Sequence, residues 1–322
     1  KPFSPERLVE ACRRALEQRG LAREVSTLRR QLAGRQALEQ RIIGHSPAIQ
    51  RLRELIANVA DTSANVLIEG ETGTGKEMLM RAMHGASPRS KEPLRTINLA
   101  SVPPGSIDSV LFGHEPGSFP GAFDRQIGAF QHCDGGTLIL DDIDRLTPAL
   151  QQRLNEALDS GIIRPVGASY GFRVDVRLLV TSNVGLDRMV EAGQFDASLA
   201  ARLGATRIVL PPLRDRTGDI PALTRHFLAR IGEQPGLNHL SVSDSALALL
   251  AAYDWPGNVR QLQSVLFRAA VYCESNSEGF RLVVAIADVS HYVRPGTALD
   301  DEDEAPVGFG GGQGDALIVR TM

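Results

Sequence analysis

The sequence reads Gly70-Glu71-Thr72-Gly73-Thr74-Gly75-Lys76-Glu77 directly after the apolar run Val66-Leu67-Ile68. A short apolar run before a Gly-rich turn predicts a buried strand. Gly70, four residues and then Gly75-Lys76 fit the P-loop, whose backbone N–H groups surround phosphates while the Lys reaches the β and γ oxygens. Glycine permits this close approach and positive φ values. A structural Gly-rich turn is the alternative, but it does not explain Lys76. The stretch therefore predicts a site for a nucleoside triphosphate.

Two further strands end in polar residues. The segment 135–142 is a turn, a hydrophobic strand and the acids Asp141 and Asp142. This is a Walker B arrangement, with Asp141 placed to hold hydrated Mg²⁺ and Asp142 placed to orient or deprotonate the attacking water. A strand predicted at 174–183 ends in Asn183. Asn183 is predicted either to sense the γ-phosphate and help place the water, or to cap the strand end.

Composition bounds the class of protein. With 322 residues and 43% hydrophobic content, the chain can bury a large core and should contain more than one structural unit. No apolar run approaches the ~18 residues that cross a bilayer, and no signal peptide is present, so we expect a soluble, cytoplasmic protein without a membrane partner. The three Cys are far apart and the seven His are scattered, which indicates neither a disulfide framework nor a zinc site. A formal charge of -3 gives no overall basic footprint for nucleic acid.

Several motifs together carry a family resemblance. They are Ile43-Gly44-His45-Ser46-Pro47, the stretch from Gly70 to Glu77, Leu111-Phe112-Gly113-His114-Glu115, Leu210-Pro211-Pro212-Leu213-Arg214-Asp215-Arg216 and Trp255-Pro256-Gly257-Asn258-Val259-Arg260. From about residue 42 to 293 the chain resembles the AAA+ domain of NtrC-type bacterial enhancer-binding proteins, which activate RNA polymerase carrying sigma-54. Glu77, which stands where the general P-loop has Ser or Thr, is normal in this family.

The resemblance implies a fold and a domain order. The fold class is α/β, an AAA+ P-loop three-layer α/β/α sandwich with a parallel sheet, followed by a small all-α lid. Residues 1–41 are expected to be the end of a receiver domain and a coiled-coil linker helix. Residues 42–213 are expected to be the nucleotide-binding subdomain, and residues 214–293 the helical lid. Residues 294–322, acidic and then Gly-rich, are expected to be a linker toward a DNA-binding domain.

The apolar spacing in the N-terminal segment has two interpretations, the first of which is a dimerisation helix. Leu21, Val25, Leu28 and Leu32 recur at steps of four, three and four, as in a coiled-coil seam. An amphipathic helix packed on its own domain is the alternative. The segment at Lys1 resembles the last corner of a receiver domain, so we expect a fragment of a longer response regulator.

The resemblance also assigns site residues. The nucleotide-binding set comprises Ile43, Gly44, the loop residues 70–77 and Arg260, which matches the family's sensor II. The expected ligands are ATP or ADP with Mg²⁺ at Asp141. Asn98 matches the residue that holds the Walker B carboxylate until activation, and Arg202 matches an arginine finger that acts on a neighbour's nucleotide. With Asp142 and Asn183, these two complete the predicted catalytic set.

Three departures from the family bear on mechanism. The loop Gly-Ala-Phe-Thr-Gly-Ala that contacts sigma-54 is here Gly117-Ser118-Phe119-Pro120-Gly121-Ala122, in which Pro removes a hydroxyl and a backbone N–H. Asp142 replaces Glu, and a carboxylate misplaced by ~1 Å can lower a rate ~100-fold; the shorter acid is also expected to miss Asn98. Asp196 replaces an Arg, which leaves only Arg202 as a finger and brings negative charge toward the γ-phosphate.

These observations give one preferred function and two alternatives. We expect an ATP-binding AAA+ module of a two-component response regulator that oligomerises, as dimers and then a ring, by resemblance a hexamer, with weakened hydrolysis and with sigma-54 remodelling in doubt. The partners implied are other copies of the chain, RNA polymerase holoenzyme, promoter or enhancer DNA and a sensor kinase. The alternatives are a fully active sigma-54-dependent activator ATPase and a general AAA+ protein or DNA remodeller. The segment 111–122 disfavours the last, because general remodellers have no such insertion.

Overall fold

A computed structural model describes Arg13, Arg14, Arg19 and Leu38 and then residues 41–234, 240–271, 274–276, 279–283 and 317–320. The chain divides into two compact units, residues 1–212 and 213–322. No helix in these described ranges is long and apolar enough to cross a membrane. The predicted seam from Leu21 to Leu32 lies outside the described residues, as do Cys12 and Cys273.

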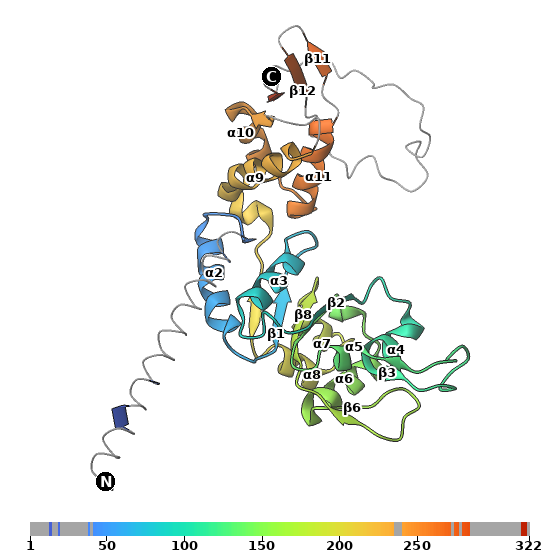
Figure 1. Cartoon of the computed structure of the whole chain (residues 1–322). Helices are drawn as coiled ribbons and strands as arrows, with labels where there is room; N and C mark the ends of the chain where they lie inside the picture. The colour runs from blue at the N-terminus through green and yellow to red at the C-terminus, as the bar shows by residue number, and fades with distance from the viewer. Residues whose placement is uncertain are drawn as a thin grey trace, which may run out of the picture. The chain divides into compact units, whose positions relative to one another are not determined.

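A five-stranded parallel sheet forms the centre of the first unit (Figure 1). Its strand order is β2-β5-β8-β1-β9. The strands are β1 (Val66–Glu69), β2 (Leu94–Asn98), β5 (Thr137–Asp141), β8 (Arg177–Ser182) and β9 (Arg207–Val209). The strands predicted at 66–68, 135–142 and 174–183 are thus β1, β5 and β8, and they are neighbours in the sheet.

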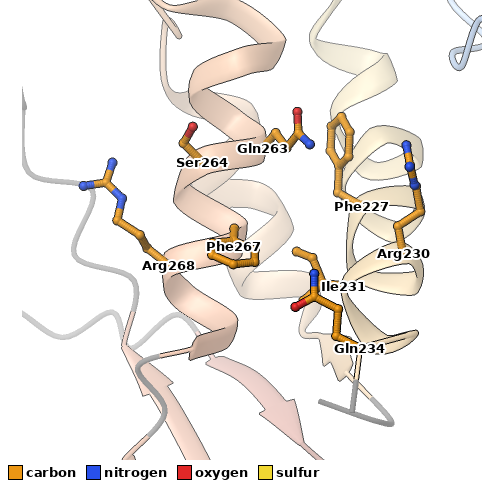
Figure 2. Close-up of a pocket in the computed structure, with 8 residues that line it drawn as sticks. All are labelled: Phe227, Arg230, Ile231, Gln234, Gln263, Ser264, Phe267 and Arg268. Carbon is orange, nitrogen blue, oxygen red and sulfur yellow. The ribbon is translucent and has the colours of Figure 1, made fainter. Parts of the chain in front are cut away.

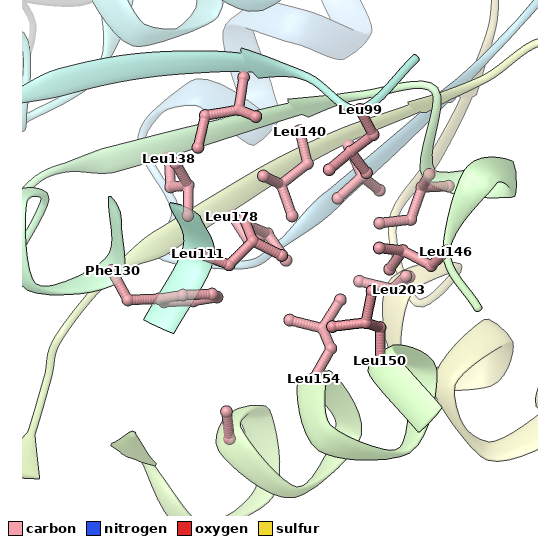
Figure 3. Packing of buried hydrophobic residues seen from close by; sticks show 14 of the residues in the cluster. Leu99, Leu111, Phe130, Leu138, Leu140, Leu146, Leu150, Leu154, Leu178 and Leu203 are labelled. Carbon is pink, nitrogen blue, oxygen red and sulfur yellow. The ribbon is translucent and has the colours of Figure 1, made fainter. Parts of the chain in front are cut away.

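Side-chain alternation along the strands divides the core into two layers. Leu138 and Leu140 of β5 belong to one buried cluster, whereas Ile139 belongs to the other. Figure 3 shows the first cluster, where strand residues such as Leu178 pack against helix residues such as Leu154. Since successive strand residues point to opposite faces, a sheet that is apolar on both must be covered by helices twice. The result is the predicted α/β/α sandwich.

The helices cover the two faces unequally. Helices α2 and α3 contribute to the cluster around Ile139, and α4 to α8 contribute to the cluster around Leu138. The helices are α2 (Pro47–Ala60), α3 (Lys76–Ala86), α4 (Ile107–Phe112), α5 (Ala129–His132), α6 (Pro148–Ser160), α7 (Leu186–Glu191) and α8 (Ala197–Leu203), with 3-10 turns η1 (Pro104–Ser106) and η2 (Ile143–Arg145). Pro at the first position and a Ser46 cap on the Ile49 N–H begin α2.

Two short antiparallel ribbons project from this unit. One pairs β3 (Gly113–His114) with β4 (Gln126–Ile127), and the other pairs β6 (Ile162–Ile163) with β7 (Phe172–Arg173). The loop 117–122 lies between β3 and β4. The ribbon therefore anchors both ends of the segment that the family resemblance assigns to partner contact.

The second unit contains the predicted helices and an unpredicted sheet. Its elements are η3 (Leu213–Asp219), α9 (Ile220–Gly232), α10 (Asp244–Ala252), α11 (Asn258–Val271), β10 (Leu240–Val242), β11 (Glu274–Asn276), β12 (Gly279–Val283) and β13 (Leu317–Arg320). The strands form an antiparallel sheet in the order β10-β13-β12-β11. The all-helical description of the lid did not foresee this sheet. Strand β13 also falls within residues 294–322, where we expected only a linker.

Candidate functional site

The order of the strands brings the predicted site residues to one edge of the sheet. Asn98 ends β2, Asp141 ends β5, Asn183 follows β8 and the loop 70–75 follows β1. Because the strands are parallel, their carboxyl ends meet at the same edge, where open α/β sheets bind ligands. The sequence order of these motifs does not reveal that β8 lies between β5 and β1.

The loop 70–75 has a backbone that favours glycine. Gly73 and Gly75 have φ values of 82° and 105°, and Gly75 immediately precedes helix α3. A Cβ on Gly70 would lie 2.9 Å from the carbonyl oxygen of Leu210. The Thr74 hydroxyl donates to the Glu71 carbonyl at 2.8 Å. The loop is therefore a tight turn whose backbone leads into a helix N-terminus, the arrangement that binds anions.

Glu69 anchors the base of this loop. Its buried carboxylate accepts from the Leu186 N–H at 2.9 Å and forms an ion pair with Arg207. Arg207 also pairs with Asp187, and hydrogen bonds to Asp187 and Glu69 raise the pKa of the guanidinium. These bonds tie β1 to β9 and α7 just before the loop begins.

Lys76 is buried and points its amine back across the loop. The Nζ donates to the carbonyl oxygens of Gly70 and Glu71 at 2.8 and 3.2 Å and to Oδ1 of Asn183 at 2.6 Å. A buried ammonium needs partners for its donors, and here they come from the loop and from the residue that follows β8. The amine is thus positioned at the sheet edge beside the strand-end residues.

Asn183 connects the lysine to the Walker B acids. Its Nδ2 donates to Oδ1 of Asp142 at 2.6 Å, while its Oδ1 also accepts from the Thr72 hydroxyl at 3.2 Å. Of the two interpretations of Asn183, a functional side chain or a strand-end cap, its bonds to other side chains favour the functional one. It lies between the cation and the acid because β8 lies between β1 and β5.

Asn98 contacts both acids from the other side. Its Nδ2 lies 3.0 Å from Asp141 Oδ2 and 3.4 Å from Asp142 Oδ2. The expectation that the shorter acid misses Asn98 was wrong, because Asp142 is still within hydrogen-bonding distance. Asn98 is nevertheless farther from Asp142 than from Asp141. Asp142 lies closer to Asn183 than to Asn98.

The donor set fits Mg²⁺. Asp141 and Asp142 offer hard carboxylate oxygens at the edge where the loop would hold phosphates, and Mg²⁺ takes one or two carboxylates together with phosphate oxygens and water. Within the described residues no group of three or more His, Cys, Asp or Glu could hold a metal alone. Glu77 is turned outward and pairs with Arg81 at 2.9 Å. A cation here would therefore depend on the nucleotide as well as on the protein.

Three predicted nucleotide-binding residues, Ile43, Gly44 and Arg260, take no part in the hydrogen bonds described above. The backbone at Ile43 and Gly44 is held by Arg53, whose guanidinium donates to the carbonyl oxygens of Ile42 and Gly44. Arg260 is an exposed residue in the first turn of α11 and belongs to the second unit. Its contact with the nucleotide stays a prediction.

Arg202 and Asp196 have local partners in this chain. Arg202 pairs with Asp159 at 2.6 Å. Asp196 is the N-cap of α8, and its carboxylate accepts from the Leu199 N–H at 2.7 Å. We interpreted Asp196 only as a lost Arg, and missed the Asp before a helical run that signals an N-cap.

The loop 117–122 is closed by its own backbone. The Ala122 N–H donates to the Phe119 carbonyl at 3.0 Å, and the Gly117 N–H donates to the Ala122 carbonyl at 2.7 Å. Pro120 followed by Gly121 with φ 99° is the arrangement that favours a type II turn. This turn does not use an N–H at position 120, so Pro fits it without losing a bond.

The aromatic residues of this loop differ in exposure. Phe119 is 40% exposed and meets the ring of His114 edge-on, with centroids 4.9 Å apart. Phe123, just past the loop, is 87% exposed. An apolar contact at this tip therefore remains available in spite of Pro120.

A pocket of about 710 Å³ lies in the second unit (Figure 2). Phe227 and Ile231 of α9 lie opposite Gln263 and Phe267 of α11 in this view, and all four side chains line the pocket. None of the residues predicted to bind nucleotide lines this pocket.

A parallel sheet with a Gly-rich loop after β1, paired acids after β5 and a polar residue after β8 defines a P-loop nucleotide-site protein of the AAA+ class. The profile "Sigma-54 interaction domain" matches residues 42–209, and "AAA+ ATPase lid domain" matches residues 214–302. The chain belongs to this family of sigma-54-interacting AAA+ domains, as the motifs predicted.

Curated relatives agree with this assignment. The chain is 41% identical over 259 residues to the Nif-specific regulatory protein of Azotobacter vinelandii, covering 80% of this chain and 49% of that protein. It is 40% identical over 277 residues to the C4-dicarboxylate transport transcriptional regulatory protein DctD of Rhizobium meliloti, covering 86% and 60%. The chain thus spans about half to three-fifths of the length of these relatives.

A solved structure is similar in both sequence and fold. It is NtrX from Brucella abortus in complex with ATP, with 33% identity and a TM-score of 0.67, covering 84% of this chain and 57% of that one. The same protein has also been solved in complex with ADP, with 35% identity and a TM-score of 0.67, covering 84% and 60%. Together with the sheet topology, these structures confirm the predicted α/β AAA+ fold.

Proposed function

We propose that this chain is the ATP-binding AAA+ module of an NtrC-type transcription regulator, with weakened hydrolysis. The observation that carries the proposal is the continuous series of hydrogen bonds from the loop through Lys76 and Asn183 to Asp142. It joins a phosphate-binding cation to the acid that would activate water. ATP and ADP are the ligands in the solved NtrX structures, which supports the same ligands here.

The residues at this edge have distinct roles in the proposed reaction. Backbone N–H groups of the loop and Lys76 would bind the phosphates, and Asp141 would hold a magnesium ion that neutralises phosphate charge. Asp142 orients the attacking water and accepts its proton. Asn183 holds Asp142 and contacts the γ-phosphate end of the site, and Asn98 holds the two acids from the other side.

Hydrolysis is weak in this proposal for two reasons. The Asp142 carboxylate is one methylene shorter than the family Glu and is bonded to Asn183 at 2.6 Å, which holds it back from water. Arg202 pairs with Asp159 and must leave that pair to reach a neighbour's nucleotide. The exposed pair itself opposes this by only ~1 kcal/mol or less, so the shorter acid is the larger effect.

The family resemblance supports a proposal for how copies of the chain assemble and which partners the whole regulator has. Copies of the chain join as dimers and then a ring, a hexamer by resemblance, in which Arg202 faces the next copy's nucleotide. The partners of the whole regulator are RNA polymerase holoenzyme and promoter or enhancer DNA, with a sensor kinase as its input. The Pro120-Gly121 turn restricts the loop that would meet sigma-54, so remodelling is impaired.

The test measures steady-state ATP hydrolysis and sigma-54 binding separately. We expect Asp142→Glu to raise turnover at least ~10-fold, equivalent to about 1.4 kcal/mol of barrier. The same variant should still not retain purified sigma-54 with ADP and a phosphoryl-transfer transition-state analogue unless Pro120→Thr is added. Fast turnover and sigma-54 retention by the unaltered chain would favour the second candidate, a fully active sigma-54 activator, which the exposed Phe119 supports.

A further inference from the structure

Thr181 is a buried hydroxyl residue of β8 that bonds to both Walker B positions. Its Oγ1 donates to Oδ1 of Asp141 and accepts from the backbone N–H of Asp142 at 3.0 Å. The side chain is fully buried. A Thr hydroxyl has one hydrogen and two lone pairs, so it can make both bonds at once.

The bond from the Asp142 N–H to the Thr181 hydroxyl holds an unusual backbone conformation. Asp142 has φ 61° and ψ 53°, the left-handed region that non-glycine residues rarely adopt. Strand alternation would send the side chains of successive residues to opposite faces. The left-handed turn ends that alternation, and both Asp141 and Asp142 come within hydrogen-bonding distance of Asn98. The Thr181 bond to the Asp142 N–H therefore fixes the turn that brings the acids together.

The bond from the Thr181 hydroxyl to Asp141 fixes the carboxylate of that acid. Oδ1 of Asp141 accepts from Thr181, and Oδ2 accepts from Asn98 at 3.0 Å. One oxygen is thus held by a residue of β8 and the other by a residue of β2, the strands on either side of β5. A carboxylate held on both oxygens cannot rotate freely, while each oxygen keeps a lone pair for a further ligand.

We propose that Thr181 is a positioning residue of the magnesium–nucleotide site. Its hydroxyl sets the orientation of Asp141 toward hydrated Mg²⁺ and the left-handed turn that directs Asp142 toward water. The inference rests on the proposed function, because it assigns Thr181 a role in that same site. Thr181 touches neither nucleotide nor water in this role and acts only through the two acids.

The same sheet offers a matched control. Thr137 is also fully buried, and its hydroxyl bonds to Nδ1 of His84 at 3.0 Å. It begins β5, at the end of the sheet away from Asp141. Thr137→Val therefore removes a buried strand hydroxyl from the same sheet without touching either acid.

The experiment measures ADP affinity with Mg²⁺ and with EDTA for the 322-residue chain. We expect Thr181→Val to reduce the gain in affinity that Mg²⁺ gives by about 10-fold, with the EDTA value unchanged within about 2-fold. Thr181→Ser, which keeps the hydroxyl, should recover most of the gain. Thr137→Val should lower the melting temperature but leave the Mg²⁺-dependent gain as in the unaltered chain.

Amide hydrogen exchange at Asp142 is the second readout and needs no nucleotide. Faster exchange in Thr181→Val, with protection kept in Thr181→Ser, supports the positioning role of Thr181. Equal Mg²⁺ dependence and equal exchange in Thr181→Val and the unaltered chain overturn it. If the Val variant does not fold, Thr181→Ala replaces it under the same criteria. Failure of the unaltered chain to bind ADP would overturn the proposed function instead. The exchange result would still decide whether Thr181 holds the turn at Asp142.

Discussion

The two ends of the central sheet use polar groups in different ways. At the amino ends, Arg177 begins β8 and is fully buried, and its guanidinium donates to the carbonyl oxygens of Val59, Ala60 and Ala64 at 2.8 to 3.1 Å. At the carboxyl ends, Asn183 and Asp142 bond mainly to other side chains. The two ends differ in whether a ligand or a water could replace the groups that bond to these residues.

Backbone carbonyls at the end of α2 and just beyond it cannot rotate away from Arg177 without local unfolding. Burial lowers the pKa of Arg177 to about 10, yet the three carbonyls satisfy the charge. Side chains such as Asn183 can change rotamer, and a phosphate or a water can take their place. We therefore expect the amino ends to serve stability and the carboxyl ends to serve ligand exchange, although the same strands β5 and β8 supply both.

The largest expected effect tests the carboxyl ends. Lys76→Ala should reduce ATP affinity at least ~100-fold, about 2.7 kcal/mol, because the phosphates lose their buried cation. Lys91→Ala is the matched control, since Lys91 is exposed and should leave affinity unchanged. Fluorescent-nucleotide titration measures both. Unchanged affinity in Lys76→Ala would remove the assignment of this edge as the nucleotide site.

The next test addresses the amino ends. Arg177→Met should lower the free energy of unfolding by about 2 kcal/mol, because three charge-assisted hydrogen bonds are lost while a buried charge is also removed. ATP affinity of the folded fraction should stay within about 2-fold. Urea denaturation gives the stability, with the exposed Arg188→Met as control. If the free energy of ATP binding fell by more than the free energy of unfolding, the result would contradict the division between the two ends.

A smaller effect on stability is expected at Asp196, which lies at the start of α8 and at neither end of the central sheet. Asp196→Arg should lower stability by about 1 kcal/mol, because α8 loses the carboxylate that caps the Leu199 N–H. Asp196→Asn should retain most of the cap. Urea denaturation of the two variants measures the structural role of the Asp196 cap by itself. In Asp142→Glu with Asp196→Arg, turnover should still exceed that of the unaltered chain at least ~10-fold.

The smallest effect is a pH dependence at the amino ends. Burial, then the nearby Arg177 and Arg41, lowers the pKa of His84 below 6.5. As pH falls from 7 to 5, the unfolded chain binds a proton that folded His84 does not, so stability decreases. We expect the melting temperature to fall by about 2 to 4 °C more in the unaltered chain than in His84→Gln. His45→Gln, at an exposed His, should behave like the unaltered chain; His226, whose pKa burial also lowers, contributes equally to all three.

Local motifs were enough to predict the loop after β1 and the acid pair at the end of β5, because each depends on residues that are close together in the chain. The loop 70–77 needs glycines and one Lys at fixed spacing, and an acid pair after a hydrophobic strand needs only that strand. The sheet in the second unit was not predicted, because strands such as β13 pair with segments far away in the sequence. The cap role of Asp196 was available from its place before a helical run, and we did not use it.

The sequence by itself determined the phosphate loop, the two acids, the continuous apolar strands and the family resemblance that implied the sandwich. Only the tertiary structure decided that β8 lies between β1 and β5, because strand order depends on long-range pairing. That order places Asn183 between Lys76 and Asp142, and it brings Thr181 against both acids. Hydrogen bonds between side chains require distances of about 3 Å. Residues about 40 to 110 positions apart reach that distance only when the sheet has formed.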